Sequence, residues 1–167
     1  MTVTRFNFRA KIGNITFFFM VAKTQTLEGV TSLQPDGSHI VLWDLENCTL
    51  EQTEDTLRKV QRKYELSHIY VASDAEGSYR AWCFSKVSYK TFLHVLLDTE
   101  HLDPIFFDYT VKRKKATLRT SNKKNRIPQR LMSVLDSYPA RIPETWEKVT
   151  YDTGLVKKGK SILLGGD

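Results

Sequence analysis

Two carboxylates stand two residues apart at the end of an apolar run, where Asp44 and Glu46 close the segment HIVLWDLE. Side chains alternate between the two faces of a strand, so a strand through His39–Asp44 would present both carboxylates on one side and Leu45 on the other. Two neighbouring acids repel each other unless they are solvated or share a cation, and hard cations such as Mg²⁺ prefer carboxylate oxygens. The pair therefore indicates either a solvated strand end or one part of a divalent metal site.

A third carboxylate, Asp108, lies within the apolar segment IFFDYTV at Ile105–Val111, which predicts a strand. A strand beside the first one would deliver Asp108 to the patch formed by Asp44 and Glu46. Three acids suit two-metal phosphoryl transfer, in which the ions activate the attacking hydroxyl and stabilise the leaving group. We expect these three residues to be catalytic and to bind Mg²⁺ or Mn²⁺, with a solvated strand residue as the alternative for Asp108.

A cation is expected beside these acids. Ser78 and Arg80 are two residues apart on the strand predicted over Tyr79–Phe84. A guanidinium makes bidentate contacts with anions, so Arg80 would point over the carboxylates toward a nucleoside triphosphate, with Ser78 beside it. The alternative is that Arg80 forms a salt bridge with Asp44 or Glu46 and holds the sheet together.

Basic residues are concentrated in one segment, because Tyr109–Leu135 contains nine Lys or Arg and no Asp or Glu. A block of this kind is typical of binding to a phosphate backbone, although single lysines are commonly only solvated. We expect Arg119 and Lys123 to bind nucleotide phosphates. The residues expected to contact nucleic acid are Lys112, Arg113, Lys114, Lys115, Lys124 and Arg126.

The elements that must position these residues follow from apolar periodicity and capping signals. Strands are predicted at His39–Asp44, His68–Ser73, Tyr79–Phe84, Ile105–Val111 and Ala116–Thr120, with helices from Leu50 to Tyr64 and from Tyr89 to Leu97. This order is the split βαβ pattern of ferredoxin-like and RNA-recognition folds. We predict an α+β fold with a mainly antiparallel sheet in the order 4-1-3-2 and helices on one face.

The composition is that of a soluble globular chain, with 41% apolar and 26% charged residues in 167. We predict a single domain over residues 1–150, with its core at 38–126, N-terminal strands within 1–37 and a tail at 151–167. One of those strands is a buried strand over Ile15–Ala22. The net charge of +6 is modest support for a polyanionic partner. No segment resembles a signal peptide or a membrane span, so we expect a cytoplasmic protein with two buried thiols.

Four segments together resemble the archaeo-eukaryotic primase superfamily. VLWDLE at Val41–Glu46 is similar to its first acidic motif, IFFD at Ile105–Asp108 to its third, SDAEGSYRAW at Ser73–Trp82 occupies the place of the second, and ATLRTSNKK at Ala116–Lys124 is similar to the basic strand that contacts nucleotide phosphates. The resemblance implies a minimal DNA primase-polymerase that uses nucleoside triphosphates on a single-stranded DNA template. It also implies a helicase or larger replication protein as partner, and a plasmid, virus or integrated element as source. In one departure from the pattern, Arg80 stands where the family has a nucleotide-binding histidine.

Other readings stay open. WDLEN at Trp43–Asn47 also resembles the opening of NYN-type (PIN-like) metal-dependent ribonucleases, which have a parallel sheet. A sheet that binds RNA or single-stranded DNA without catalysis is a third reading, in which Trp43, Trp82 and Phe84 stack on bases. An inactive primase-like binding subunit is a fourth, and a rolling-circle nicking enzyme is disfavoured because no pair of histidines flanks an apolar residue.

Overall fold

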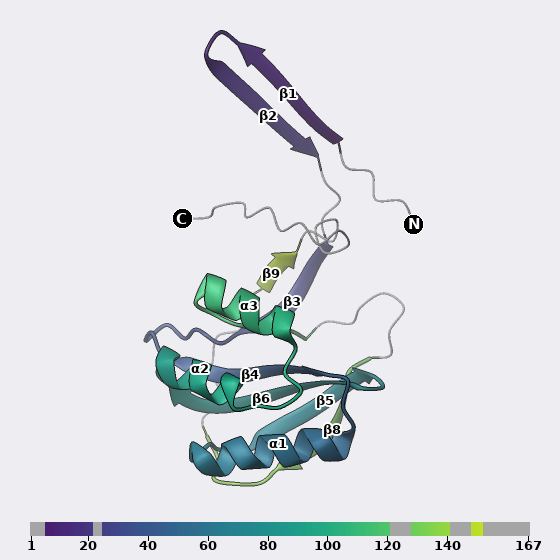
Figure 1. Cartoon of the computed structure of the whole chain (residues 1–167), viewed down its shortest axis with the longest axis vertical. Coiled ribbons are helices and arrows are strands. Elements are labelled where there is room, and N and C mark those ends of the chain that lie inside the picture. Colours follow the sequence, from purple (N-terminus) through teal and green to yellow (C-terminus); the bar gives the residue numbers. More distant parts are fainter. Residues whose placement is uncertain (1–5, 22–24, 121–127, 141–147, 152–167) are drawn as a thin grey trace. The chain divides into compact units, whose positions relative to one another are not determined.

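A four-stranded antiparallel sheet in the order β4-β6-β5-β8 forms the centre of the fold (Figure 1). Its strands are β4 (His39–Glu46), β5 (Ile69–Ala75), β6 (Ser78–Val87) and β8 (Arg130–Leu135). The computed structural model describes residues 6–21, 25–120, 128–140 and 148–151. The sheet belongs to a unit formed by Glu28–Glu147, whereas Met1–Leu27 and Lys148–Asp167 form a second unit. The single domain over residues 1–150 stays a prediction.

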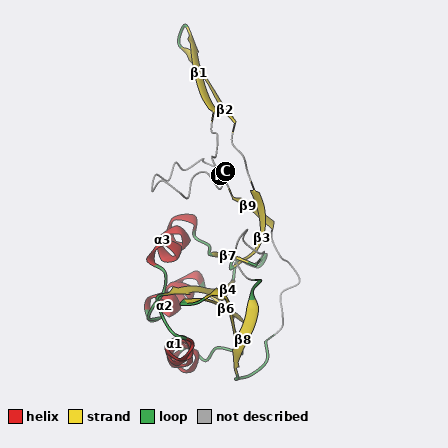
Figure 2. Ribbon diagram, turned by 90° about the vertical axis from the view of Figure 1, so that its right-hand side faces the viewer, coloured by secondary structure: helices red, strands yellow, loops and turns green. Residues whose placement is uncertain are grey.

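Three helices accompany this sheet, namely α1 (Leu50–Lys63), α2 (Tyr89–Leu97) and α3 (Pro104–Arg113). Figure 2 shows all three on one side of the four-stranded sheet. The predicted α+β class with a mainly antiparallel sheet is confirmed. Within the described part of the chain, no helix is long and apolar enough to cross a membrane.

Helix α1 begins where its capping signal predicts. The Thr49 hydroxyl accepts a hydrogen bond from the backbone N–H of Gln52 at 3.2 Å, and the Gln52 side chain accepts one from the Thr49 backbone N–H at 2.8 Å. This capping box satisfies two N–H groups that the first helical turn leaves without partners. Leu57 and Val60 then bury the apolar stripe of the helix against the core.

The strand predicted over Ile105–Val111 is wrong, because these residues lie in α3. The Asp103 side chain accepts a hydrogen bond from the N–H of Ile105 at 2.8 Å, and Pro104 occupies the first turn. Proline has a backbone dihedral suited to that position and lacks an N–H that would otherwise be unsatisfied there. Phe106 and Thr110, four residues apart, are the buried side chains of the helix. The capping pair and this spacing outweigh the strand propensity of the aromatic and β-branched residues.

Strand β4 is buried on both faces. The direction of the Trp43 side chain shows to which face Asp44 points. The indole of Trp43 donates a hydrogen bond to the Thr99 hydroxyl just after α2, at 3.0 Å, so Trp43 points to the helix side. Neighbouring residues of a strand point to opposite sides, so Leu42 and Asp44 point away from the helices. We call that side of the sheet the helix-free face.

A second sheet has the order β7-β3-β9, made of β3 (Gln25–Thr31), β7 (Thr117–Arg119) and β9 (Lys148–Tyr151). Strand β7 confirms the strand predicted over Ala116–Thr120, and it pairs antiparallel with β3. Beyond the paired residues, the backbone N–H of Ser32 donates to the Ala116 carbonyl, and the backbone N–H of Ala116 donates to the Ser32 hydroxyl, both at 2.9 Å. These bonds continue the contact between the β3 and β7 segments past the end of β3, in the direction of β4.

A separate β-hairpin near the start of the chain joins β1 (Phe6–Ile12) to β2 (Ile15–Val21). Its turn needs a left-handed residue, which Gly13 supplies with φ of +58°. The strand predicted over Ile15–Ala22 is therefore present over Ile15–Val21. Its predicted burial is wrong at the described side chains, because Ile15 is 62% exposed and Phe17 is 43% exposed.

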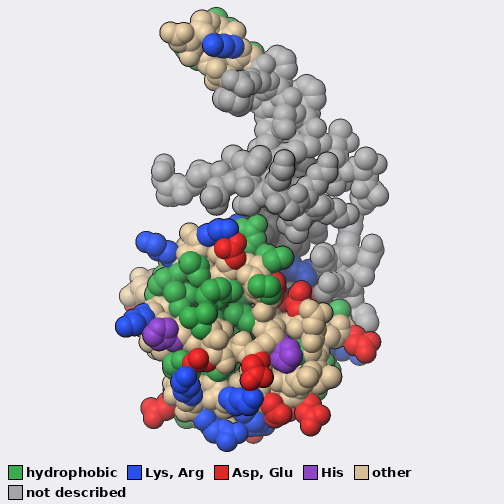
Figure 3. Space-filling model, in the orientation of Figure 1, with side chains coloured by type: hydrophobic (Ala, Val, Ile, Leu, Met, Phe, Trp, Pro, Cys, Tyr) green, Lys and Arg blue, Asp and Glu red, His purple; other side chains and the backbone are tan. Residues whose placement is uncertain are grey.

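The helix side of the molecule carries a broad apolar area (Figure 3). Large exposed side chains on the two helices nearest to it include Leu97 of α2 and Val111 of α3. This surface lies opposite the helix-free face, which carries Asp44 and Arg80.

Candidate functional site

Cross-strand pairing brings several predicted residues together on the helix-free face. Asp44 of β4 lies opposite Arg80 of β6, and Glu46 lies opposite Ser78. Directly opposed residues of an antiparallel pair project to the same side, a few ångströms apart. The prediction that Asp44, Glu46, Ser78 and Arg80 share one patch is therefore confirmed in its geometry.

Asp108 does not join this patch. It lies on α3, where its exposed carboxylate forms an ion pair with Lys112 one helical turn later, at 2.5 Å. No three His, Cys, Asp or Glu side chains of the described chain come together in a way that could hold a metal ion. The predicted triad of Asp44, Glu46 and Asp108 is not assembled, because the element that carries its third member is a helix rather than a neighbouring strand.

Asp74 and Arg119 combine with Arg80 and Asp44 in a buried charge cluster, which we call the Asp–Arg cluster. Asp74 Oδ2 accepts hydrogen bonds from Arg80 Nη1 at 3.0 Å and from Arg119 Nη2 at 3.1 Å. Arg80 Nε also lies 3.9 Å from Asp44 Oδ1. The Asp74 side chain is 3% exposed and that of Arg80 is 7% exposed. The alternative in which Arg80 bridges to Asp44 is confirmed, and Arg119, predicted to meet phosphate, contacts a carboxylate.

Burial raises the pKa of Asp44 to about 6. This pKa is the net result of burial, which has the largest effect, of the Arg80 guanidinium, which lowers it, and of the carboxylates of Asp103, Glu46 and Asp74, which raise it. Asp103 lies near Asp44 because its backbone N–H donates a hydrogen bond to the Asp44 carbonyl at 2.8 Å. This bond joins the start of α3 to β4. Asp103 and Asp74 were not anticipated from the sequence, since both contacts join distant parts of the chain.

Replacing Asp44 with asparagine should change how stability depends on pH. The folded pKa of about 6 lies above the ordinary value of 3.8, so the folded chain holds this proton more tightly than the unfolded chain does. The stability that this carboxyl group contributes is therefore fully present below about pH 4 and is lost as the pH rises through about 6. Two units of pKa correspond to roughly 3 kcal/mol, so Asp44→Asn should gain about that much relative to the parent between pH 4 and 7.

Urea unfolding of both proteins from pH 4 to pH 8 measures this difference. Asp44→Asn keeps the shape of the side chain and cannot titrate, so the parent curve should fall with pH while the variant curve is flatter. Parallel curves would show that Asp44 titrates normally in the folded chain.

Aromatic side chains occupy the part of the helix-free face next to the Asp–Arg cluster. Trp82 of β6 lies opposite Tyr70 of β5, which in turn lies opposite Val134 of β8. The Tyr70 and Phe84 rings are 5.6 Å apart at 46°. We call Tyr70, Trp82 and Phe84 the aromatic row, and all three are half-buried. Trp43, the other predicted base-stacking residue, is fully buried on the helix side and is excluded from that role.

An open pocket of about 280 Å³ lies beside Phe84, at the end of β6. The half-exposed Tyr138 and Lys86 also line it, and Lys86 forms an ion pair with Asp36 at 2.6 Å. Two aromatic rings and a cation around one opening suit a flat ring that carries a negative group. The aromatic row therefore continues into a hollow at its edge.

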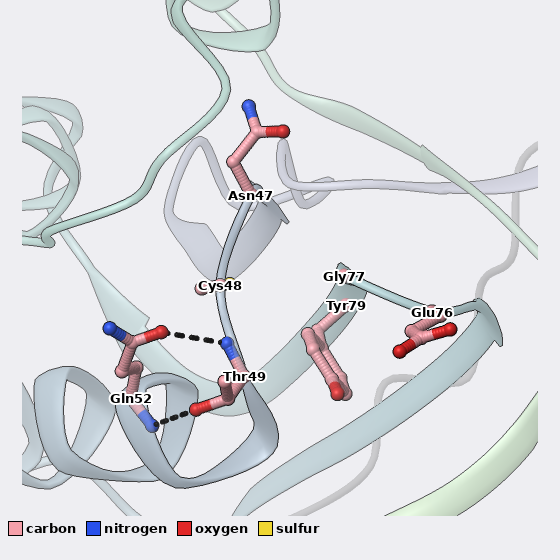
Figure 4. Close-up of a pocket in the computed structure, with 7 residues that line it drawn as sticks. All are labelled: Asn47, Cys48, Thr49, Gln52, Glu76, Gly77 and Tyr79. Carbon is pink, nitrogen blue, oxygen red and sulfur yellow. Dashed lines mark hydrogen bonds between the residues drawn. The ribbon is translucent and has the colours of Figure 1, made fainter.

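A second open pocket, of about 340 Å³, lies between the β4–α1 loop and the β5–β6 turn (Figure 4). Its lining residues are Asn47, Cys48, Thr49, Gln52, Glu76, Gly77 and Tyr79. Two of the N–H groups at the start of α1 are already bound by the side chains of Thr49 and Gln52, and the charged residue of the lining is an acid, Glu76. This pocket does not suit a nucleoside triphosphate.

The predicted basic residues fall into two groups. Lys112 and Arg113 end α3, and the following Lys114 closes it in the left-handed conformation with φ of 54°. These three are exposed, and Lys115 next to them is half-buried. The predicted phosphate contacts at Lys123, Lys124 and Arg126 lie outside the described residues. No protein-family model, curated protein sequence or solved structure matches the chain.

Proposed function

We propose that the chain binds single-stranded nucleic acid on the helix-free face of its four-stranded sheet, as a primase-like domain without catalytic activity. The aromatic row carries this proposal, because three half-buried rings lie on the face that the helices leave free. Bases of a single strand stack on aromatic side chains of such sheets, and each stacked base contributes about 1–3 kcal/mol.

Charge supports the same conclusion. Acids at the centre of a sheet repel phosphate, but here Arg80 and Arg119 compensate Asp74 and Asp44 within the Asp–Arg cluster. The whole chain carries a net charge of +6, which favours a polyanionic partner.

The strand order supports a variant of the split βαβ fold. β4, β6 and β5 follow the order 1-3-2 that this fold requires, and α1 connects β4 to β5. We propose a ferredoxin-like ancestry in which β8 extends the sheet beyond β5. The expected fourth strand beside β4 is instead α3, which separates this domain from a catalytic primase core. The antiparallel order does not support the NYN-type ribonuclease alternative.

Metal-dependent nucleotidyl transfer is the second candidate, favoured by the pairing of Asp44 with Arg80 and of Glu46 with Ser78. Asp44 and Glu46 are the residues that would hold Mg²⁺ or Mn²⁺ there. They fit a two-metal site poorly, because Asp108 lies on α3 away from them and Asp44 already faces a guanidinium. We therefore rank nucleotidyl transfer, with a nucleoside triphosphate as ligand, below nucleic-acid binding without catalysis.

Fluorescence anisotropy with a labelled 20-nucleotide dT strand, the matching U strand and a 20-base-pair duplex tests the proposal. Both single strands should bind at least tenfold more tightly than the duplex, because duplex bases offer no free faces for stacking. Binding should weaken as salt rises. Duplex binding as tight as single-strand binding would contradict the proposal.

A nucleotide-incorporation assay separates the two candidates. It uses the same dT strand with and without a primer, labelled dATP, and Mg²⁺ or Mn²⁺, beside the protein carrying Asp44→Ala and Glu46→Ala. We expect no product from either protein. Product that disappears in the double variant would make nucleotidyl transfer the function of the chain.

A further inference from the structure

Two apolar stripes run side by side on the helix side of the molecule. Tyr89, Leu93 and Leu97 are spaced four residues apart on α2, and Phe107 and Val111 are spaced likewise on α3. Residues four apart lie on one face of a helix. The Tyr89 hydroxyl approaches the carbonyls of Thr110 and Val111 at 3.4 and 3.5 Å, so the α2 stripe faces the end of α3. The two stripes meet at the seam between the helices.

This seam is exposed. Leu97 is 65% exposed and Val111 is 43% exposed, whereas Leu93 and Phe107 between them are half-buried. Figure 3 shows apolar side chains gathered over this part of the surface. We call Leu93, Leu97, Phe107 and Val111 the helix-seam patch. Continuous apolar surface of this kind on a soluble domain commonly marks an interaction site.

Positive charge lies at one end of the helix-seam patch, where the start of α2 meets the end of α3. Lys90 of α2 and Arg113 and Lys114 at the end of α3 are exposed, and none of them has an acidic partner in the part of the chain that the structure describes. The nearby acids are already paired, because Asp108 contacts Lys112 and Asp98 contacts Lys63. A partner that supplies negative charge at this end of its contact surface would therefore be complementary.

We propose that the helix-seam patch binds an amphipathic helix of a partner protein, with an apolar face toward the seam and acidic residues along its flanks. Two parallel apolar stripes with half-buried residues between them match the ridge of side chains on one helix. A second copy of this chain would bring like charges together. A membrane would require the apolar side chains to protrude, whereas Leu93 and Phe107 are recessed.

This site is independent of the proposed nucleic-acid interface. The helices lie on one side of the four-stranded sheet (Figure 2), and the strand registers place the aromatic row on the other, so both surfaces can be occupied together. A partner bound at the helix-seam patch would leave the helix-free face open to a single strand. The two proposals can therefore fail separately.

A pair of synthetic peptides tests the proposal with the full-length chain. Both are fluorescein-labelled 18-residue helices with the same leucine face, one flanked by glutamates and the other by lysines. The glutamate peptide should show saturable binding by anisotropy, and the lysine peptide should bind at least tenfold more weakly. Equal binding of the two peptides, or no saturable binding of either, would overturn the proposal.

Variants of the patch complete the test. Leu97→Glu and, separately, Lys90→Glu should each weaken binding of the glutamate peptide roughly tenfold, whereas Leu131→Glu on β8 should leave it unchanged. Leu97 and Leu131 are 65% and 61% exposed, so both substitutions are matched in exposure and compatible with folding, which circular dichroism verifies. Leu97→Glu should also leave dT-strand binding unchanged.

Three results would assign the patch to another role. Equal weakening by Leu131→Glu would show that the peptide does not bind at the seam. Sedimentation of the chain with phosphatidylserine vesicles, lost in Leu97→Glu, would make the occupant a membrane. Dimerisation in analytical ultracentrifugation that Leu97→Glu abolishes would make it a second copy of the chain.

Discussion

Replacing Asp74 with alanine is expected to lower the free energy of unfolding by about 3–5 kcal/mol, the largest effect of any single change on the helix-free face. Asp74 is 3% exposed and accepts hydrogen bonds from both Arg80 and Arg119. Its loss leaves two guanidinium groups in a buried site without the carboxylate that both contact, and Asp44 lies 3.9 Å from Arg80. A buried charge that loses its partner is costly, because it retains its desolvation penalty without the compensating attraction.

Chemical denaturation of Asp74→Ala beside Glu100→Ala measures the effect. Both substitutions remove a carboxylate from an ion pair, but the pair between Lys59 and Glu100 is 64% exposed on each side, so the control should lose no more than about 1 kcal/mol. Similar losses in the two variants would show that the Asp–Arg cluster is solvated and holds nothing together. The loss of unfolding free energy in Asp74→Asn should lie between those of the two variants, because asparagine keeps the shape of the side chain and removes its charge.

Local signals in the sequence predicted most of the elements around the site. Alternating apolar residues identify β4, β5 and β6, and the Thr49 and Gln52 pair identifies the start of α1. These signals succeed because they depend on residues within a few positions of one another. The pairing of Asp44 with Arg80 followed from the order of three strands alone.

Helix α3 shows where such reasoning fails. Its residues favour a strand when read one by one, although the Asp103–Pro104 pair before them is a helix start. Only the burial of Phe106 and Thr110 on one face shows that a helix is the better packed choice. The position of Asp108, and with it the predicted metal triad, depended on this one element.

The Asp–Arg cluster could not be predicted for a different reason. Asp74 belongs to a segment whose residues are typical of a turn. In the structure the register between β5 and β6 shifts between Ser73 and Ala75, and Asp74, which lies at this shift, accepts a hydrogen bond from Arg80. Arg119 arrives from β7, forty-five positions later. Long-range contacts of this kind depend on how strands are placed, and a single sequence carries no local signal for them.

Replacing Tyr70 and Trp82 with leucine is expected to weaken binding of the dT strand more than any other change that leaves the fold intact. Each ring lost from the aromatic row should cost about 1–3 kcal/mol, or roughly five- to 150-fold in affinity per substitution. Leucine keeps the apolar contacts with the sheet, so the loss reports on stacking rather than on packing. Anisotropy titrations of the single and double variants measure it.

A matched control on the helix side decides whether the aromatic row is the interface. Tyr109→Leu removes a half-buried ring from α3, where it lies 4.9 Å from the Arg113 guanidinium, and should leave dT-strand binding unchanged. If Tyr109→Leu weakens binding as much as Tyr70→Leu does, the strand contacts the basic end of α3 instead. If neither changes it, binding depends on charge alone, and its salt dependence should then be unaltered in every ring variant.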